Sequence, residues 1–125
     1  SSDLEELLNS YYNSITYSDY VLDKLLKYFA NKNTFIYFSS DHGVSLGDSN
    51  IIGQGATGDN VPKEQHDIAM FMWMSDEFLR DHIDEFNKVK LQKNKPVSHD
   101  NIFHSILDCS GVKSWVIEKN LSLCR

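Results

Sequence analysis

The sequence predicts an α/β fold with a central, mostly parallel sheet that is flanked by helices. Two continuous apolar runs, at residues 34–39 and 68–74, have the length of strands. Such runs are typical of strands that are covered on both faces, as in a parallel sheet with helices on either side. Before and after them, apolar residues recur at three- and four-residue steps, which predicts the flanking helices.

The first helical pattern occupies the beginning of the chain. Ser2, followed by Glu5 three residues later, has the spacing of a capping box, so we expect the helix to begin there. The polar residues 31–33 are expected to end it. Its apolar face consists of Leu4, Leu7, Leu8, Tyr11, Ile15, Leu22, Leu25, Leu26 and Phe29.

A polar, glycine-bearing segment separates the two predicted strands. We expect residues 40–66 to form a loop without regular structure, and so long a loop inside a compact domain is often functional. After the second strand, Ser75 is expected to cap a helix, which a loop over residues 88–97 follows. Ser98 is expected to cap a third helix that Gly111 ends.

The size and charge of the chain limit what it can be. With 125 residues it is at most one domain, and two strands make a marginal sheet, so we expect a fragment or a larger segment that completes the sheet. The net charge of −6 and the lack of a basic stripe argue against a nucleic-acid partner. No apolar run approaches the roughly 20 residues that span a bilayer, and no signal peptide opens the chain.

An acidic residue and a histidine follow the first predicted strand. Asp41 and His42 stand where the apolar run gives way to the polar segment, and Gly43 gives the backbone freedom to leave extended geometry. In open α/β sheets, ligands bind beyond the carboxyl ends of the strands. Carboxylate oxygen and imidazole nitrogen are both zinc ligands. From the residues alone, a metal site and a purely local hydrogen-bonding role for this pair both remain open.

Four blocks of the chain occur in the same order, at similar spacings, in one enzyme family. They are Ser40-Asp41-His42-Gly43 continuing through Ser45-Leu46-Gly47-Asp48, then Pro62-Lys63-Glu64-Gln65, the strand that ends in Trp73-Met74-Ser75, and Ser98-His99-Asp100-Asn101-Ile102-Phe103-His104. Together they resemble the bacterial phosphoethanolamine transferases of the alkaline phosphatase superfamily, from about Leu7 to Ser114. The Asp-His-Gly motif alone also occurs in sulfatases and phosphatases, whereas the four ordered blocks are far more specific.

The resemblance implies that residues 1–125 form the C-terminal part of an alkaline-phosphatase-like catalytic domain. Such enzymes are anchored in the bacterial inner membrane, with the catalytic domain in the periplasm. They move phosphoethanolamine from phosphatidylethanolamine to lipid A, another lipopolysaccharide sugar or a related glycan, a modification associated with polymyxin resistance. The reaction passes through a phosphorylated threonine at a zinc ion, and the resemblance places that threonine and the membrane anchor upstream.

The resemblance also assigns roles to individual residues. By position, Asp41 and His42 are two of the zinc ligands, and the family's remaining glutamate and threonine ligands belong upstream. Relatives usually have a glutamate at the position of Val44, which is a minor departure. They usually have a histidine at the position of Gln54, where it contacts substrate phosphate or a second metal. Gln54 is therefore a candidate substrate-binding residue whose chemistry differs from that of the family.

Two further residues are candidates for contact with substrate. Lys63 can reach an anionic headgroup or remain a solvated loop lysine, and His99 can lie beside the site or simply begin a helix. The other histidines, His66, His82 and His104, are interpreted as structural or surface residues. A serine nucleophile would need a base partner, and none is identified.

The two cysteines, Cys109 and Cys124, allow one disulfide or two buried thiols, and counting alone favours neither. The periplasmic compartment that the resemblance implies is oxidising. Gly111 ends the third helix just after Cys109, so the tail can fold back. We therefore expect a disulfide between the two.

Three hypotheses for the function follow. The first is a zinc-dependent phosphoethanolamine transferase. The second is another hydrolase of the superfamily, a sulfatase or a phosphodiesterase, which the blocks at 62–65 and 98–104 disfavour. The third is a non-catalytic domain that uses this scaffold for binding, because no nucleophile is assigned within the chain.

Overall fold

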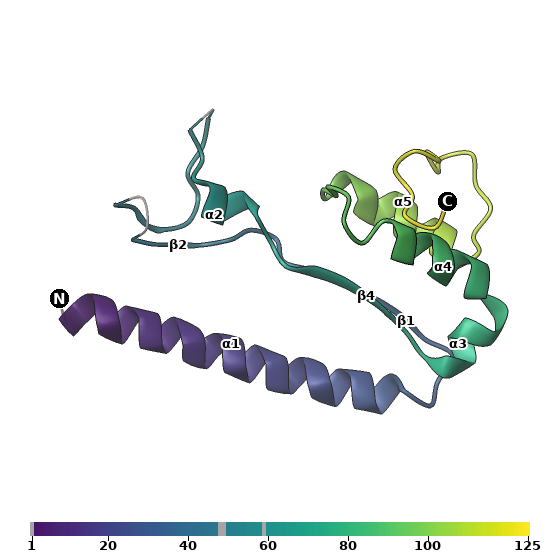
Figure 1. The fold of residues 1–125 in the computed structure, drawn as a ribbon, viewed down its shortest axis with the longest axis horizontal. Helices are drawn as coiled ribbons and strands as arrows, with labels where there is room; N and C mark the ends of the chain where they lie inside the picture. Colours follow the sequence, from purple (N-terminus) through teal and green to yellow (C-terminus); the bar gives the residue numbers. More distant parts are fainter. Residues whose placement is uncertain (1, 48–49, 59) are drawn as a thin grey trace. The chain divides into compact units, whose positions relative to one another are not determined.

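The computed structural model describes residues 2–47, 50–58 and 60–125, so Asp48 of the predicted metal-binding signature lies outside the described residues. The chain divides into two compact units (Figure 1). The first unit comprises Ser1–Tyr28 and Phe38–Phe71, and the second comprises Phe29–Tyr37 and Met72–Arg125. Within the described ranges, no helix is both long and apolar enough to cross a bilayer.

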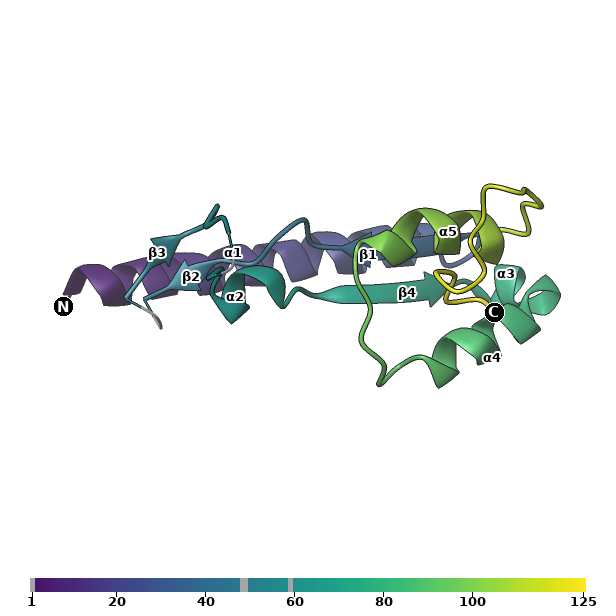
Figure 2. The same cartoon turned by 90° about the horizontal axis from the view of Figure 1, so that it is seen from above.

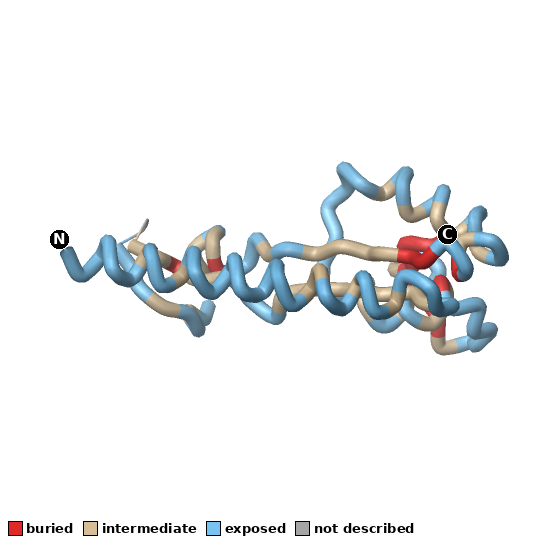
Figure 3. Tube along the Cα trace, turned by 90° about the horizontal axis from the view of Figure 1, so that it is seen from below, coloured by how far each residue is buried: buried red, intermediate tan, exposed pale blue. Residues whose placement is uncertain are grey.

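Helix α1 (Ser2–Phe29) confirms the helix predicted at the start of the chain. The predicted capping box is wrong, because Ser2 already lies inside the helix and its hydroxyl donates to the Asp3 carboxylate at 3.2 Å. On the polar side of the helix, Lys27 and Asp23 form an ion pair one turn apart, at 2.7 Å. Every residue of α1 keeps some exposure, so its apolar face is only partly covered (Figure 3).

Strands β1 (Phe35–Ser39) and β4 (Met70–Met74) confirm the two predicted strands and pair with each other in a two-stranded sheet. The predicted parallel arrangement does not hold for them. The Ser40 N–H donates to the Ala69 carbonyl and the Ser75 N–H to the Thr34 carbonyl, each at 3.0 Å, so the end of each strand lies beside the start of the other.

The physical reason is the connection between the strands. A parallel pair needs a crossover that carries the chain back to the end where it started, usually a long helix. In its described residues, the segment between β1 and β4 has no long helix, and it brings the chain back beside the end of β1. A continuous apolar run reports how a strand is covered, and it carries no information about strand direction.

The segment between these strands is more regular than predicted. Strands β2 (Ser45–Leu46) and β3 (Ile52–Gly53) pair antiparallel, with Ser45 opposite Gly53, and helix α2 (Lys63–His66) follows them. Figure 2 shows the three elements gathered beyond the adjacent end of β1 and start of β4. Two-residue strands and a four-residue helix are too short to produce a periodic sequence pattern, which is why the segment was predicted to be an irregular loop.

The second unit contains helices α3 (Asp76–Asp81), α4 (Ile83–Leu91) and α5 (Asp100–Cys109). The predicted cap of α3 is confirmed, because the Ser75 hydroxyl accepts from the Phe78 N–H at 3.2 Å. The single predicted helix is wrong, because His82 leaves helical geometry at φ −131° and separates α3 from α4. The apolar face continues across this break, so periodicity could not locate it. Helix α4 also extends into the predicted loop at 88–97.

Helix α5 confirms the third predicted helix, and it begins one residue later than expected, with His99 rather than Ser98 at its N-cap. The Ser98 hydroxyl still accepts from the Asp100 N–H, at 3.3 Å. Gly111, at φ 76°, ends the helix as predicted, since its N–H bonds to the Asp108 carbonyl at 3.0 Å. The left-handed conformation suits glycine, which has no side chain to clash there.

The tail after α5 folds back onto that helix. A disulfide joins Cys109 and Cys124, whose Cα atoms are 5.4 Å apart. The Leu123 N–H donates to the hydroxyl of the buried Ser105 at 3.1 Å, and Asn101 donates to the Leu121 carbonyl at 2.9 Å. Among the described residues, all buried apolar side chains belong to this second unit: Met74, Phe78, Cys109, Ile117, Leu123 and Cys124 (Figure 3).

An ion pair also holds the tail. The Arg125 guanidinium donates to both carboxylate oxygens of Asp108, at 2.7 and 2.8 Å, and the Ser122 hydroxyl donates to one of them. The hydrogen bond from Arg125 is the main reason that the pKa of Asp108 lies below its ordinary value of 3.8. The charged carboxylate is therefore favoured in the folded protein. Its contribution is fully present above pH 3.8 and is lost as the pH falls through the lower, folded-state pKa.

Asp108→Asn is expected to loosen the tail, because it removes the charge that both Arg125 and Ser122 bind. The urea midpoint at pH 7 should fall relative to the unmodified protein, and the difference should shrink as the pH is lowered below 3.8. The matched control is Glu118→Gln, which neutralises an exposed carboxylate in the same tail. Equal midpoints for Asp108→Asn and the control at pH 7 would contradict a stabilising role for the ion pair.

Candidate metal centre

Asp41 and His42 lie directly beyond the end of β1, in non-strand geometry. In an extended strand, neighbouring side chains point to opposite faces. Here the Asp41 Oδ2 and His42 Nε2 atoms are 3.5 Å apart, so the two side chains converge. Both are open to solvent, with 86% of the Asp41 side chain and 45% of the His42 side chain exposed. The structure therefore brings the two predicted metal ligands together at an accessible position.

Local hydrogen bonds orient both side chains. The His42 N–H donates to Asp41 Oδ1 at 3.0 Å, which leaves Oδ2 directed at the ring. His42 Nδ1 lies 3.0 Å from the Gly43 carbonyl oxygen. A carbonyl only accepts, so this contact places a proton on Nδ1, and in the neutral ring the lone pair is then on Nε2. Histidines that bind metals characteristically donate their other ring N–H in this way.

The geometry of the pair fits zinc. Two ligand atoms at the usual zinc distances and a tetrahedral angle lie about 3.4 Å apart. The observed separation of 3.5 Å between Oδ2 and Nε2 agrees with that value. One carboxylate oxygen and one imidazole nitrogen also suit the metal chemically. Within residues 2–47, 50–58 and 60–125, no group of three or more His, Cys, Asp or Glu residues gathers, so Asp41 and His42 are the part of a site that can be described.

Gly43 is held by an unusually close backbone approach. Its N–H donates to the Gln65 carbonyl at 2.9 Å. A β-carbon added at this position would lie 2.0 Å from the Glu64 carbonyl oxygen, far inside van der Waals contact. Only glycine therefore allows the turn after His42 to lie against helix α2. The sequence predicts backbone freedom as the role of Gly43, whereas the structure requires its lack of a side chain.

The predicted substrate-binding residues are distributed over other elements. Gln54 is exposed and follows β3. Lys63 begins α2, and its amine pairs with Asp67 at 3.2 Å while remaining 80% exposed. His99 precedes α5 in the second unit. Gln54 and Lys63 thus share the first unit with the candidate ligands Asp41 and His42, and His99 does not.

Two buried residues, Ser45 and Gln65, have no role that the sequence predicts. They are the only buried residues of the first unit among those described, with 0% and 6% of their surface exposed. Both belong to blocks of the family resemblance, Ser45 to the first and Gln65 to the second, which is the signal that the sequence offers. The hydrogen bonds that make these residues important join separate segments, so no local pattern in the sequence reveals them.

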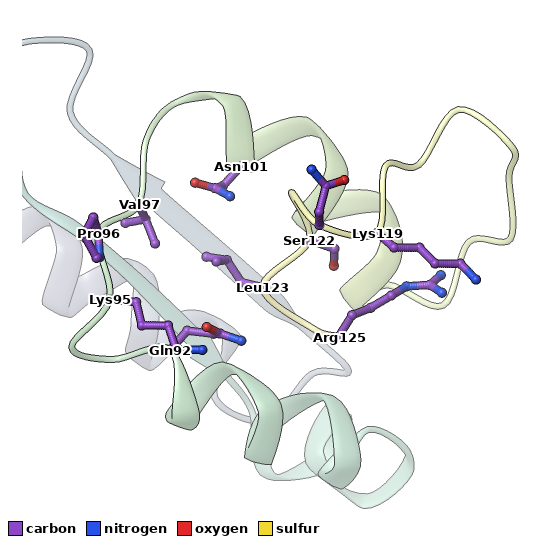
Figure 4. Close-up of a pocket in the computed structure, with 10 residues that line it drawn as sticks. Gln92, Lys95, Pro96, Val97, Asn101, Lys119, Ser122, Leu123 and Arg125 are labelled. Atoms are coloured by element: carbon purple, nitrogen blue, oxygen red, sulfur yellow. The ribbon is translucent and has the colours of Figure 1, made fainter.

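The described residues of the second unit line a separate cavity of about 350 Å³. It lies between the residues after α4 and the tail, and its lining includes the cations Lys95, Lys119 and Arg125. In Figure 4 the side chains of Lys119 and Arg125 extend to the side away from Lys95, so the three cations do not converge. Arg125 is also neutralised by Asp108. The cavity contains none of the predicted metal ligands.

Comparison with known sequences gives matches over most of the chain. The sulfatase family model matches residues 1–112. Phosphoethanolamine transferase EptA of Escherichia coli K12 is 33% identical over 115 residues, which are 88% of this chain and 21% of that protein. Kdo(2)-lipid A phosphoethanolamine 7''-transferase of the same strain is 27% identical over 113 residues, which are 87% of this chain and 20% of that protein. The chain thus spans about a fifth of the length of these curated relatives.

Two solved structures are similar to the chain. The C-terminal periplasmic domain of phosphoethanolamine transferase EptC from Campylobacter jejuni matches with a TM-score of 0.82 and 30% identity, over 98% of this chain and 39% of that one. The soluble domain of lipooligosaccharide phosphoethanolamine transferase A from Neisseria meningitidis matches with a TM-score of 0.82 and 28% identity, over 93% of this chain and 36% of that one.

Gly43→Ala is expected to displace the turn that carries the candidate ligands, because the new β-carbon would overlap the Glu64 carbonyl. Overpacking of this kind costs about 1–3 kcal/mol, which should appear as a lower urea midpoint, and zinc affinity should fall about 10-fold or more. Val44→Ala is the matched control, since it changes the next residue without adding an atom. Zinc affinity and stability equal to those of the unmodified protein would refute the close approach.

Proposed function

The chain belongs to the sulfatase family and is related to the bacterial phosphoethanolamine transferases, and from this premise we propose that it is the C-terminal part of the catalytic domain of a zinc-dependent phosphoethanolamine transferase. The observation that supports the proposal most directly is the convergence of Asp41 Oδ2 and His42 Nε2 beyond the end of β1, 3.5 Å apart. An accessible pair of this composition can hold one face of a zinc ion. The related proteins give the class of reaction.

In this proposal, the residues of the chain hold and orient one side of the site. Asp41 supplies its carboxylate oxygen Oδ2. Its other oxygen, Oδ1, accepts from the backbone N–H of His42, which keeps the carboxylate directed at the imidazole ring. The contact between His42 Nδ1 and the Gly43 carbonyl keeps the Nε2 lone pair available. Zinc bound there would lower the pKa of a hydroxyl nucleophile and neutralise charge on the transferring phosphoryl group.

The finer features of the reaction are proposals that rest on the relatives. The donor is phosphatidylethanolamine, and phosphoethanolamine passes through a threonine outside this chain to lipid A or another lipopolysaccharide glycan. One relative is named for transfer to Kdo(2)-lipid A, and a solved relative for a lipooligosaccharide acceptor. Both solved relatives are soluble or periplasmic domains, which supports a periplasmic position beside the inner membrane. Such lipid A modification would contribute to polymyxin resistance.

Gln54, Lys63 and His99 are proposed as contacts for the anionic substrate. The Lys63 amine is paired only at the surface, so it can leave Asp67 for a phosphate at little cost. Gln54 is exposed, and its amide can donate to a phosphate oxygen without carrying charge. His99 adjoins a helix start, in the other unit.

The family match also favours a second candidate, a sulfatase or phosphodiesterase that hydrolyses its substrate. Turnover of phosphatidylethanolamine with an added glycan acceptor, compared with turnover of an aryl sulfate and a phosphodiester, separates the two. Transfer to the acceptor supports the proposed function. Hydrolysis of the sulfate ester or the phosphodiester without transfer would replace it.

Asp41→Ala and His42→Ala, each made in the full-length protein, should strongly reduce phosphoethanolamine transfer and lower the zinc content. Loss of one ligand leaves the ion incompletely held, and a fall of about 100-fold or more in turnover is expected. Zinc is measured by elemental analysis, beside the transfer assay. His66→Ala is the matched control, because it removes an exposed histidine of the same unit. Unchanged zinc content and turnover in either variant would refute the assignment.

Gln54→His should restore a second metal-binding position without disturbing the first. A glutamine amide is a far poorer zinc ligand than imidazole, so the unmodified protein is expected to hold one tightly bound zinc ion. Anomalous scattering from crystals soaked in excess zinc measures the occupancy of each position. A fully occupied second metal bound by Gln54 in the unmodified protein would contradict this expectation.

A further inference from the structure

The first unit is organised around two buried polar side chains, those of Ser45 and Gln65. Among its described residues, none with an apolar side chain is buried. A buried amide or hydroxyl is stable only when its hydrogen bonds are satisfied. Hydrogen bonds therefore take the place that an apolar core has in the second unit.

The Gln65 side chain connects three separate segments. Its Oε1 accepts from the Ala56 N–H at 3.0 Å, and its Nε2 donates to the Ser45 hydroxyl at 2.9 Å and, more weakly, to the Gly53 carbonyl at 3.4 Å. The Ser45 hydroxyl in turn donates to the Glu64 carboxylate at 3.1 Å. The amide thus joins β2, the end of β3 and the segment after it to helix α2, with its acceptor and both donors in use.

The backbone of the same residue holds the metal-binding turn. The Gln65 carbonyl accepts from the Gly43 N–H at 2.9 Å, and the Gly43 carbonyl faces His42 Nδ1 at 3.0 Å. A single residue, Gly43, therefore connects the Gln65 carbonyl to the imidazole. Helix α2 has four residues and no side-chain cap hydrogen bond, so its position depends on contacts with other segments. The Glu64 carboxylate provides one of these contacts through Ser45, and the Gln65 amide provides three, from the residue whose carbonyl holds Gly43.

We propose that Gln65 is a positioning residue for the metal ligand His42, an inference that rests on the proposed function. The side-chain amide locks α2 onto the β2–β3 hairpin, and the backbone carbonyl of the same residue then holds Gly43. In this way the hairpin fixes the orientation of the His42 ring and the place of Nε2 beside Asp41. Loss of the amide leaves both ligands chemically intact and reduces their affinity for zinc through misplacement.

The test compares Gln65→Met and Gln65→Glu in the full-length protein. The first keeps the length of the side chain and removes all of its hydrogen bonds. The second keeps an acceptor for Ala56 and loses the two N–H donors. Competition with a chromophoric chelator gives the zinc dissociation constant. We expect it to rise about 10- to 100-fold in Gln65→Met, the range found for partners of metal ligands, and less in Gln65→Glu.

A second measurement distinguishes a positioning role of Gln65 from a merely structural one. The urea midpoint of each zinc-free variant reports folding, and affinity is compared at a urea concentration of zero, where the protein is folded. Gln92→Met is the matched control, a glutamine at the C-cap of α4 in the other unit. A lower zinc-free midpoint with an unchanged zinc dissociation constant would overturn the proposal. If Gln65→Met does not fold, the constant measured for Gln65→Glu decides in the same way.

The two hypotheses fail differently. If Asp41→Ala and His42→Ala leave zinc binding unchanged, the proposed function fails and the inference falls with it. If those variants lose zinc while both Gln65 variants bind it as tightly as the unmodified protein, only the positioning role is overturned. The double variant Gln65→Met/Gly43→Ala tests the shared path through Gly43. If it binds zinc no more weakly than Gln65→Met alone, the two residues act through the same path.

Discussion

The hydrogen bond from the Gly43 N–H to the Gln65 carbonyl, 2.9 Å long, is the constraint on which the candidate metal centre depends. This bond joins a residue near the beginning of the segment between β1 and β4 to a residue near its end. A second bond, from the Ser40 N–H to the Ala69 carbonyl at 3.0 Å, closes the same segment just outside it. Asp41 and His42 lie between these two points. Their backbone is held on both sides, while their ligand atoms remain open to solvent.

This arrangement reconciles two requirements of a metal centre. The ligand atoms must be accessible, and they must also be placed accurately before the ion arrives. Exposed side chains on a long loop would satisfy only the first requirement. Here the absence of a β-carbon at Gly43 allows the turn to approach α2, and the buried Ser45 and Gln65 hold α2 against the hairpin. The placement of the candidate ligands is thus provided by residues other than the ligands themselves.

The second unit is held together by different means. Its tail is joined to α5 by the disulfide between Cys109 and Cys124, by the ion pair of Asp108 with Arg125, and by hydrogen bonds to Ser105 and Asn101. In the two solved relatives, the matching elements belong to domains more than twice as large as this chain, which covers 39% and 36% of them. The half-buried residues of β1 are consistent with strands that are further covered in such domains.

The sequence by itself determined the elements whose signals are local. The amphipathic spacing of α1, the apolar runs of β1 and β4, the Ser75 cap and the Gly111 stop each depend on a few neighbouring residues, and each agrees with the structure. The family was also recognisable, because its four blocks are short and ordered. The adjacency of Asp41 and His42 could be read directly, although adjacency alone did not distinguish a metal site from a local role.

Tertiary structure decided whatever depends on residues far apart in the chain. The antiparallel pairing of β1 with β4 follows from where the connecting segment returns, which an apolar run does not encode. The convergence of Asp41 and His42 depends on a turn that Gln65 holds from a distance along the sequence. The burial of Gln65 and Ser45 is equally non-local, because a polar residue carries no sign of its burial until its partners are in place.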